Sequence, residues 1–147
     1  MRLRFGYVLV CEEVVRDASG AVVELKCTHV PGTAMGGKMP DKEKVKGIIH
    51  WVSAPHALAA EVRLYDRLFT TAEPGAGGGD FLNDINPDSL TVLAQAALEP
   101  AAAAYVPGDR MQFERMGYFS VDKESAPGSP VFNRVVTLRD NWANKDA

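Results

Sequence analysis

The chain has 147 residues, of which 46% are hydrophobic and 24% charged, and its formal net charge at pH 7 is −3. This length and composition suit one ordinary domain or two very small ones with a buried core, and they exclude a disordered protein. No run approaches the roughly 18 apolar residues of a membrane span, and nothing is typical of a signal peptide, so we expect a cytoplasmic protein without a membrane partner. The negative charge argues against nucleic-acid binding, which depends largely on basic surface.

The first thirty residues predict a β-hairpin. From residue 2 to residue 9 the side chains alternate, with Arg2 and Arg4 on the polar face, which is typical of a half-buried strand. Residues 17–20 (DASG) predict a turn, and residues 21–30 predict the returning strand.

Strand-like and irregular stretches alternate through the middle of the chain. Residues 31–40 contain three glycines and two prolines and predict a loop. Residues 44–53 and 60–69 are rich in Val, Ile, Trp, Tyr and Leu and predict two strands, separated at residues 54–55 by Ala-Pro. Residues 71–79 interrupt regular structure again.

The last part of the chain predicts further short elements. Asp80 is the acidic cap of a short helix that ends at residues 86–87 (Asn-Pro). Residues 89–97 fit a strand and a helix equally well, whereas 110–121 and 131–138 predict two strands joined by a flexible loop. Many short strands with little helix indicate an all-β fold made of closed or sandwiched sheets.

No motif of a catalytic or metal site is present. The sequence lacks a phosphate-binding G-x-x-x-x-G-K-[ST] loop, a G-x-S-x-G elbow and an H-E-x-x-H pair. His29, His50 and His56 are the only histidines, too few convergent ligands for a metal, and we expect them to pack or to hydrogen-bond. Cys11 and Cys27 fall on the two strands of the predicted hairpin and are interpreted as reduced, partly buried thiols.

Five stretches, which together cover nearly the whole chain, resemble one protein family in the same order. They are RLRFGYVLVCEEVVRDASG (2–20), KVKGIIHWVSAPHALAAEVRLYDRLF (44–69), DFLNDINPDSL (80–90), MQFERMGYFSVD (111–122) and VFNRVVTLRDNWA (131–143). The family is the C-terminal anticodon-binding region of glutaminyl-tRNA synthetases.

The resemblance implies two small β-barrels side by side, of the kind also found in a ribosomal 5S rRNA-binding protein, with one or two short helices. Residues 1–147 would form the anticodon-binding region, with lobes at 1–70 and 88–143 and a linker at 71–87. The family's barrel region begins further upstream, so we expect the chain to be a piece of a larger synthetase.

That larger protein would be a ligase that joins glutamine to its tRNA and uses ATP with Mg in a catalytic domain of the same polypeptide. The chain has neither of the two ATP-handling signatures of such enzymes, the HIGH-type and KMSKS-type motifs. We therefore expect it to be inactive by itself, with no catalytic residue and no cofactor, and to select the RNA by binding the anticodon loop of the tRNA for glutamine.

The resemblance also implies which residues contact the anticodon. Arg2 and Arg4 match positions that contact the first anticodon nucleotide and its backbone, and Gln112 and Arg115 match positions that read the central uridine. An arginine offers a rigid fork of donors, and the amide of Gln112 can donate to uracil and accept from it. Phe113 alternates with Gln112 and is expected to face the core.

Two further residues, Arg139 and Asn141, match family positions close to the RNA, although Asn141 replaces a threonine that is frequent there. Strict alternation along a strand would place Gln112 and Arg115 on opposite faces, so they converge only if a bulge or a twist intervenes.

Three alternatives remain open from the sequence. The first is the same region of a related glutamyl-tRNA synthetase, since both anticodons contain the central uridine. The second is a ribosomal-type 5S rRNA binder with a similar barrel, although such proteins tend to be more basic. The third is a small hydrolase that uses His50, His56 and Asp66.

Overall fold

The computed structural model describes residues 1–38 and 45–138. Within them all regular structure is β-strand except for five short 3₁₀ helices, which confirms the all-β class. No helix in the described part of the chain is long and apolar enough to cross a membrane. The chain divides into two compact units, Met1–Trp51 and Val52–Ala147.

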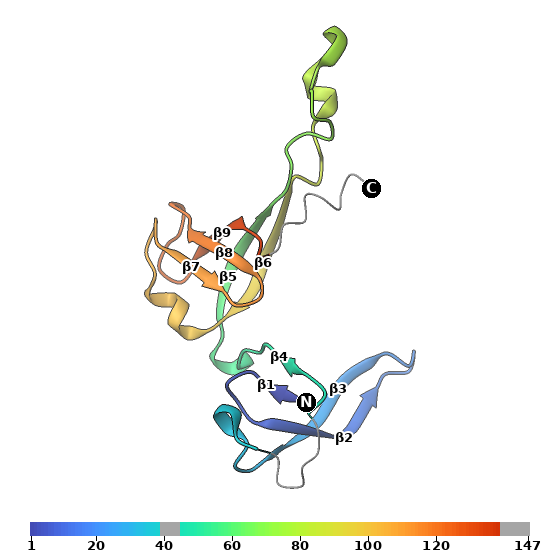
Figure 1. The fold of residues 1–147 in the computed structure, drawn as a ribbon, viewed down its shortest axis with the longest axis vertical. Coiled ribbons are helices and arrows are strands. Elements are labelled where there is room, and N and C mark those ends of the chain that lie inside the picture. Colours follow the sequence, from blue (N-terminus) through green and yellow to red (C-terminus); the bar gives the residue numbers. More distant parts are fainter. Residues whose placement is uncertain (39–44, 139–147) are drawn as a thin grey trace. The chain divides into compact units, whose positions relative to one another are not determined.

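The first unit contains a four-stranded sheet with the order β3-β2-β1-β4. Its strands are β1 (Arg2–Leu3), β2 (Val8–Arg16), β3 (Val22–Val30) and β4 (Ile48–Ile49). Strands β2 and β3 form the predicted hairpin (Figure 1). The Asp17 carboxylate closes its turn by accepting hydrogen bonds from the backbone N–H groups of Ser19 and Ala21. Cys11 lies opposite Cys27, and both are exposed, so the prediction of partly buried thiols was wrong.

A tight turn replaces the single strand that the sequence predicted from residue 2 to residue 9. The Gly6 N–H donates to the Leu3 carbonyl at 2.9 Å and the Leu3 N–H donates to the Tyr7 carbonyl at 2.9 Å, so the chain reverses directly after β1. Phe5 supports the reversal with a left-handed φ of 56°. Polar and apolar residues alternate here without a continuous strand, and Arg2 and Arg4 therefore do not share a strand face.

The loop after β3 contains the 3₁₀ helix η1 (Ala34–Gly36). The predicted strand at 44–53 is reduced, within the described residues, to β4, which pairs in parallel with β1. Strand β1 has only two residues and lies between β2 and β4 in the sheet.

The second unit contains a five-stranded sheet with the order β6-β5-β9-β8-β7. Its strands are β5 (Leu58–Tyr65), β6 (Leu90–Leu98), β7 (Arg110–Phe113), β8 (Gly117–Val121) and β9 (Val131–Val136). Strand β5 runs antiparallel to β6 and parallel to β9. It therefore belongs to the second unit, and the division of the chain differs from the expected lobes at 1–70 and 88–143.

Strands β5 and β6 form a long ribbon that continues into two 3₁₀ helices, η3 (Ala76–Gly78) and η4 (Phe81–Asp84) (Figure 1). The Asp80 carboxylate accepts from the Leu82 N–H, as predicted for an acidic cap. Residues 89–97, which fitted either structure, lie almost entirely in β6. Before β5 lies η2 (Ala54–His56), and after β6 lies η5 (Pro100–Ala104).

The second unit has a compact hydrophobic core. Phe119 and Phe132 are 2% and 0% exposed, and they pack with the other buried residues Ala60, Val62, Leu98, Ala102 and Val121. Neither sheet closes on itself in the described part of the chain, since β3 and β4 are the edges of one sheet and β6 and β7 the edges of the other. The expectation of closed barrels is corrected accordingly to two open sheets.

Candidate nucleic-acid interface

A hairpin replaces the single strand predicted at 110–121. Gln112 pairs with Tyr118 and Phe113 with Gly117, while the Met116 N–H donates to the Phe113 carbonyl at 2.9 Å. Gly117 has a φ of +143°, and a Cβ there would lie 2.5 Å from a backbone oxygen of β9. Only glycine fits this position, which is the first residue of β8 after the reversal at residues 114–116.

Aromatic packing fixes which way the hairpin faces. The rings of Phe113 and Phe119 stack with centroids 4.3 Å apart, and Phe113 also contacts Phe132 at 5.3 Å. Phe113 thus packs against the core, as predicted. Because neighbouring strand residues point to opposite faces, Gln112 points outward, and its side chain is exposed.

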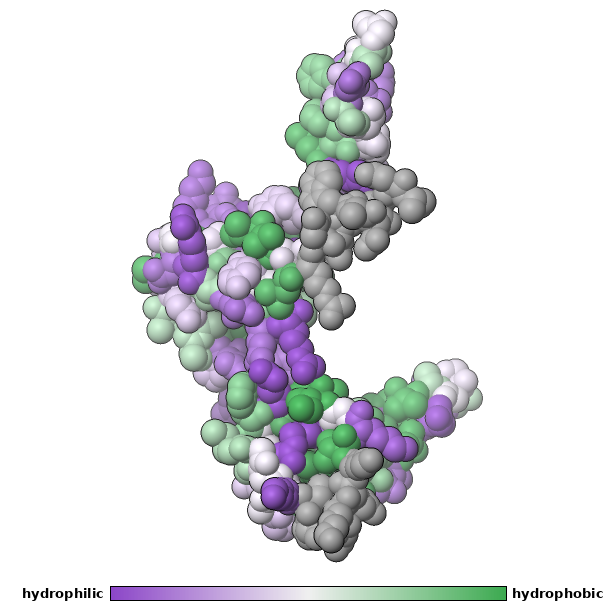
Figure 2. All heavy atoms as spheres, in the orientation of Figure 1, coloured by the Kyte–Doolittle hydropathy of each residue, from purple (hydrophilic) through white to green (hydrophobic). Residues whose placement is uncertain are grey.

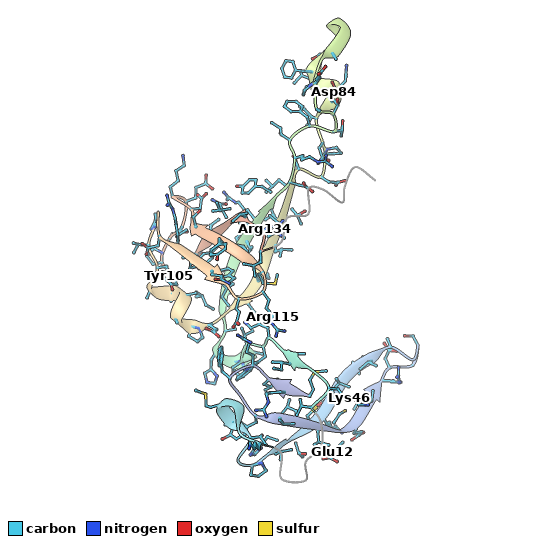
Figure 3. The ribbon with its side chains drawn as sticks, viewed as in Figure 1. Glu12, Lys46, Asp84, Tyr105, Arg115 and Arg134 are labelled. Atoms are coloured by element: carbon cyan, nitrogen blue, oxygen red, sulfur yellow. The ribbon has the colours of Figure 1, made fainter. Side chains whose placement is uncertain are left out.

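Arg115 lies in the turn of this hairpin and is exposed (Figure 3). Its φ of 65° is unusual for a bulky residue, and such backbone strain is concentrated at functional positions. The turn breaks the strand alternation between Gln112 and Arg115. Their assignment to one recognition site therefore requires no bulge or twist in a continuous strand.

Arg2 has a structural role in the first unit. Its guanidinium donates to the Thr33 carbonyl at 2.5 Å and to the Gly37 carbonyl at 2.7 Å. Thr33 is completely buried, and its hydroxyl accepts from the Val8 N–H and donates to the Val30 carbonyl. Arg2 and Thr33 together hold the loop after β3 against β1 and β2.

Arg4 lies in the turn that follows β1. Its backbone N–H donates to the Ile49 carbonyl, and its own carbonyl accepts from the Trp51 indole N–H at 3.0 Å. Its guanidinium carbon lies 4.8 Å from the centroid of the Phe5 ring, a cation–π distance. The backbone of Arg4 is thus fixed from both sides.

The four predicted contact residues are divided between the units. Arg2 and Arg4 belong to the first unit and Gln112 and Arg115 to the second. The two further predicted residues, Arg139 and Asn141, lie outside the described residues.

Comparison with protein families decides the class of the chain. The model of one family, described as the anticodon-binding domain of class I tRNA synthetases (E and Q), matches residues 48–122, which is half of the chain. The chain belongs to this family.

Curated relatives agree with this family. The chain is 53% identical to a glutamine–tRNA ligase of Ectopseudomonas mendocina, 54% identical to one of Pseudomonas aeruginosa and 52% identical to one of Cupriavidus taiwanensis. Each match covers 97% of this chain and 24 to 26% of the relative. The chain therefore spans about a quarter of the length of the curated relatives that it matches.

The matched range of this anticodon-binding domain contains Gln112 and Arg115 but not Arg2 or Arg4. It also contains Tyr118, which is exposed directly opposite Gln112 and which the sequence analysis did not single out. The proximity of Tyr118 to Gln112 can be recognised only when the turn at 114–116 is known, since a continuous strand would place the two residues six positions apart.

Two of the three histidines, His29 and His56, make local contacts, whereas His50 is exposed. His56 Nδ1 lies 2.8 Å from the Ser53 hydroxyl across η2, and the His29 ring lies edge-on to Tyr7 with centroids 4.9 Å apart. No group of three or more His, Cys, Asp or Glu side chains in residues 1–38 and 45–138 could hold a metal. Family membership decides against the hydrolase alternative and against the ribosomal one.

An ion cluster that the sequence analysis missed joins β5 to the loop after β8. Arg63 contacts Glu61 at 2.6 Å, Glu124 at 2.8 Å and Asp122 at 3.7 Å. The backbone N–H of Glu124 and the amide of Asn133 lower the pKa of the Asp122 carboxyl, with a further contribution from Arg63. These residues come from three separate stretches of sequence, and no local pattern connects them.

Proposed function

We propose that the chain is the part of a glutamine–tRNA ligase that binds the anticodon loop of the tRNA for glutamine. The observation that carries the proposal lies inside the range matched by the family, where Gln112 is exposed and followed by the strained turn that contains Arg115. In the longer protein the catalytic domain would join glutamine to the tRNA with ATP and Mg, in the cytoplasm.

Gln112 and Arg115 are proposed to read the central uridine. A glutamine amide donates and accepts at once, which suits the mixed donor and acceptor edge of uracil better than that of cytosine. Single-stranded bases in a loop can be splayed out and read at this edge. Arg115 offers a planar fork of donors to the same base or to its phosphate.

Arg2 and Arg4 are proposed to contact the first anticodon nucleotide. A guanidinium has five N–H donors, and Arg2 uses two contacts to hold the loop after β3, so donors remain for RNA. Arg139 and Asn141 are proposed to lie near the RNA as well.

Glutamine is preferred to glutamate because the curated relatives described above carry the name glutamine–tRNA ligase. A uridine-reading pair by itself would serve both tRNAs. Parallel binding measurements with the anticodon stem-loops of the two tRNAs separate these alternatives.

Titration of the chain with the glutamine anticodon stem-loop at low salt tests the proposal. We expect weak binding that falls steeply with salt, because the contacts to the rest of the tRNA are absent and phosphate contacts release counterions. The control is the same stem with a scrambled loop. Equal affinity for both loops contradicts the proposal.

A further inference from the structure

The outward face of the β7–β8 hairpin carries an aromatic ring beside Gln112. Tyr118 is the direct cross-strand partner of Gln112, and it is 48% exposed. Directly opposite residues of an antiparallel pair have Cβ atoms about 4.5 to 5.5 Å apart on the same face of the sheet. The amide and the ring are therefore immediate neighbours.

Two features of the hairpin hold this ring in place. Strand β8 lies between β7 and β9, and Tyr118 pairs with Gln112 on one side and Val136 on the other. The next residue along, Phe119, is 2% exposed and anchors the strand in the core. An exposed tyrosine on a strand with two neighbours is a rigid surface, because its backbone is fixed and few side-chain torsions remain free.

A positively charged side chain, Arg110, lies on the same outward face of the hairpin as Gln112 and Tyr118. Arg110 lies two residues before Gln112 on β7, hence on the same side, and it is exposed opposite Ser120. A flat ring, an amide and a cation side by side are the groups that bind an unpaired nucleotide by stacking, by edge recognition and by phosphate attraction.

We propose that Tyr118 is the stacking surface for the anticodon base whose edge Gln112 reads. Side chains of a sheet stand roughly perpendicular to it, so a base stacked on the Tyr118 ring also stands on the sheet and directs one edge toward Gln112. This inference rests on the proposed function, and it adds a residue that fixes the position of the base.

Binding of the glutamine anticodon stem-loop by Tyr118→Ala and Tyr118→Phe tests the inference. Stacking on one base predicts that Tyr118→Ala weakens binding about 5- to 150-fold, whereas Tyr118→Phe keeps the ring and stays within about twofold. The matched control is Tyr105→Ala, since Tyr105 is 44% exposed in the same unit and follows η5 (Figure 3).

A second RNA that lacks the base at the central anticodon position distinguishes stacking on that base from a structural role of the Tyr118 ring. If Tyr118 stacks on that base, Tyr118→Ala and the wild type bind the abasic RNA with the same affinity, because the stacking partner is missing. An equal loss on both RNAs overturns the proposal, and so does a loss by Tyr118→Ala matched by Tyr105→Ala.

Failure of this inference differs from failure of the proposed function. If the wild-type chain binds the glutamine stem-loop no better than the scrambled loop, the proposed function fails. If the wild type prefers the glutamine loop and Tyr118→Ala binds it equally well, only the stacking role is wrong.

Discussion

The two units are stabilised by different means. In the second, large apolar side chains such as Phe119 and Phe132 are buried in one core. In the first, Val8 is the only buried hydrophobic residue among those described, and its backbone N–H donates to the buried hydroxyl of Thr33. The predicted RNA-binding residues therefore differ between the units, because Arg2 helps to hold the fold of the first unit together, whereas Gln112 is exposed on the surface of the second.

The β2–β3 hairpin adds little to the core of the first unit. Apolar side chains of the β2–β3 hairpin are exposed on both strands (Figure 2), namely Val10, Val14, Val22, Val23 and Leu25. They contribute little burial, so the local hydrogen bonds of Arg2 and Thr33 carry more of the stability of this unit.

The largest effect is expected in the core of the second unit. Phe132→Ala removes a completely buried ring and should lower the free energy of unfolding by about 3 to 5 kcal/mol. Phe81→Ala is the matched control, because Phe81 is 53% exposed and makes one edge-on aromatic contact, worth about 1 kcal/mol.

Hydrogen exchange resolved along the chain measures this prediction. Amides of β5, β8 and β9 should lose protection in Phe132→Ala, whereas those of β2 and β3 keep theirs. Equal loss of protection in both units would contradict the contrast between them.

The first unit should instead be sensitive to a polar change. Thr33→Val keeps the size of the side chain but leaves the buried Val8 N–H without its acceptor, which costs about 1 to 3 kcal/mol. Thr33→Ser keeps the hydroxyl and loses one methyl, at about 0.8 kcal/mol. Urea unfolding followed by hydrogen exchange of β2 and β3 compares the two, and equal costs would mean that the hydroxyl is unimportant.

The sequence predicted the strands better than the turns. The β2–β3 hairpin was predictable because alternation and the DASG turn agree. The reversals at residues 4–6 and 114–116 were missed because Phe5 and Arg115 take left-handed conformations that turn rules assign to Gly, Asn or Asp.

These missed turns explain what was and was not predictable at the site. Gln112 and Arg115 were found through a family resemblance, and Phe113 was correctly assigned to the core by alternation. Tyr118 and the Arg63 cluster depend on pairing between distant stretches, which one sequence does not reveal.

Recognition residues of the second unit should affect RNA discrimination and leave stability nearly unchanged. Gln112→Ala should cost about 1 to 3 kcal/mol in discrimination between central uridine and cytosine, the scale of a good base contact. Gln95→Ala, an exposed glutamine of β6, is the control. Stem-loop titrations and thermal unfolding measure both quantities, and a lower Tm with unchanged discrimination would assign Gln112 to the fold.

Arg115 allows a sharper version of the same test. Arg115→Gly removes the side chain and relieves the left-handed φ, so the free energy of unfolding should change by less than about 1 kcal/mol while discrimination falls as for Gln112→Ala. Arg115→Ala removes the same contact but keeps the strain, and should discriminate equally poorly. If the two variants differ in discrimination, the turn geometry and not the guanidinium sets the recognition.

The smallest expected effect is the loss of stability at acidic pH, which should depend on a different carboxylate in each unit. The pKa of Asp122 is lowered first by the Glu124 N–H and then by the Asn133 amide, and that of Asp17 first by the Ser19 hydroxyl and then by the Ala21 N–H. A carboxyl whose pKa is lower in the folded state than in the unfolded state, where it is about 3.9, stabilises the fold above that pH. This stability is lost as the pH falls through the folded-state pKa.

We therefore expect both units to lose stability when the pH falls below about 4. Asp122→Asn should flatten this dependence for β5, β8 and β9, and Asp17→Asn for β2 and β3, because each carboxylate accepts hydrogen bonds from its own unit. Urea midpoints for each unit on either side of that pH, read by hydrogen exchange, measure the effect. If either substitution flattens the acid dependence of both units, the two units unfold together, and a separate free energy of unfolding cannot be assigned to each.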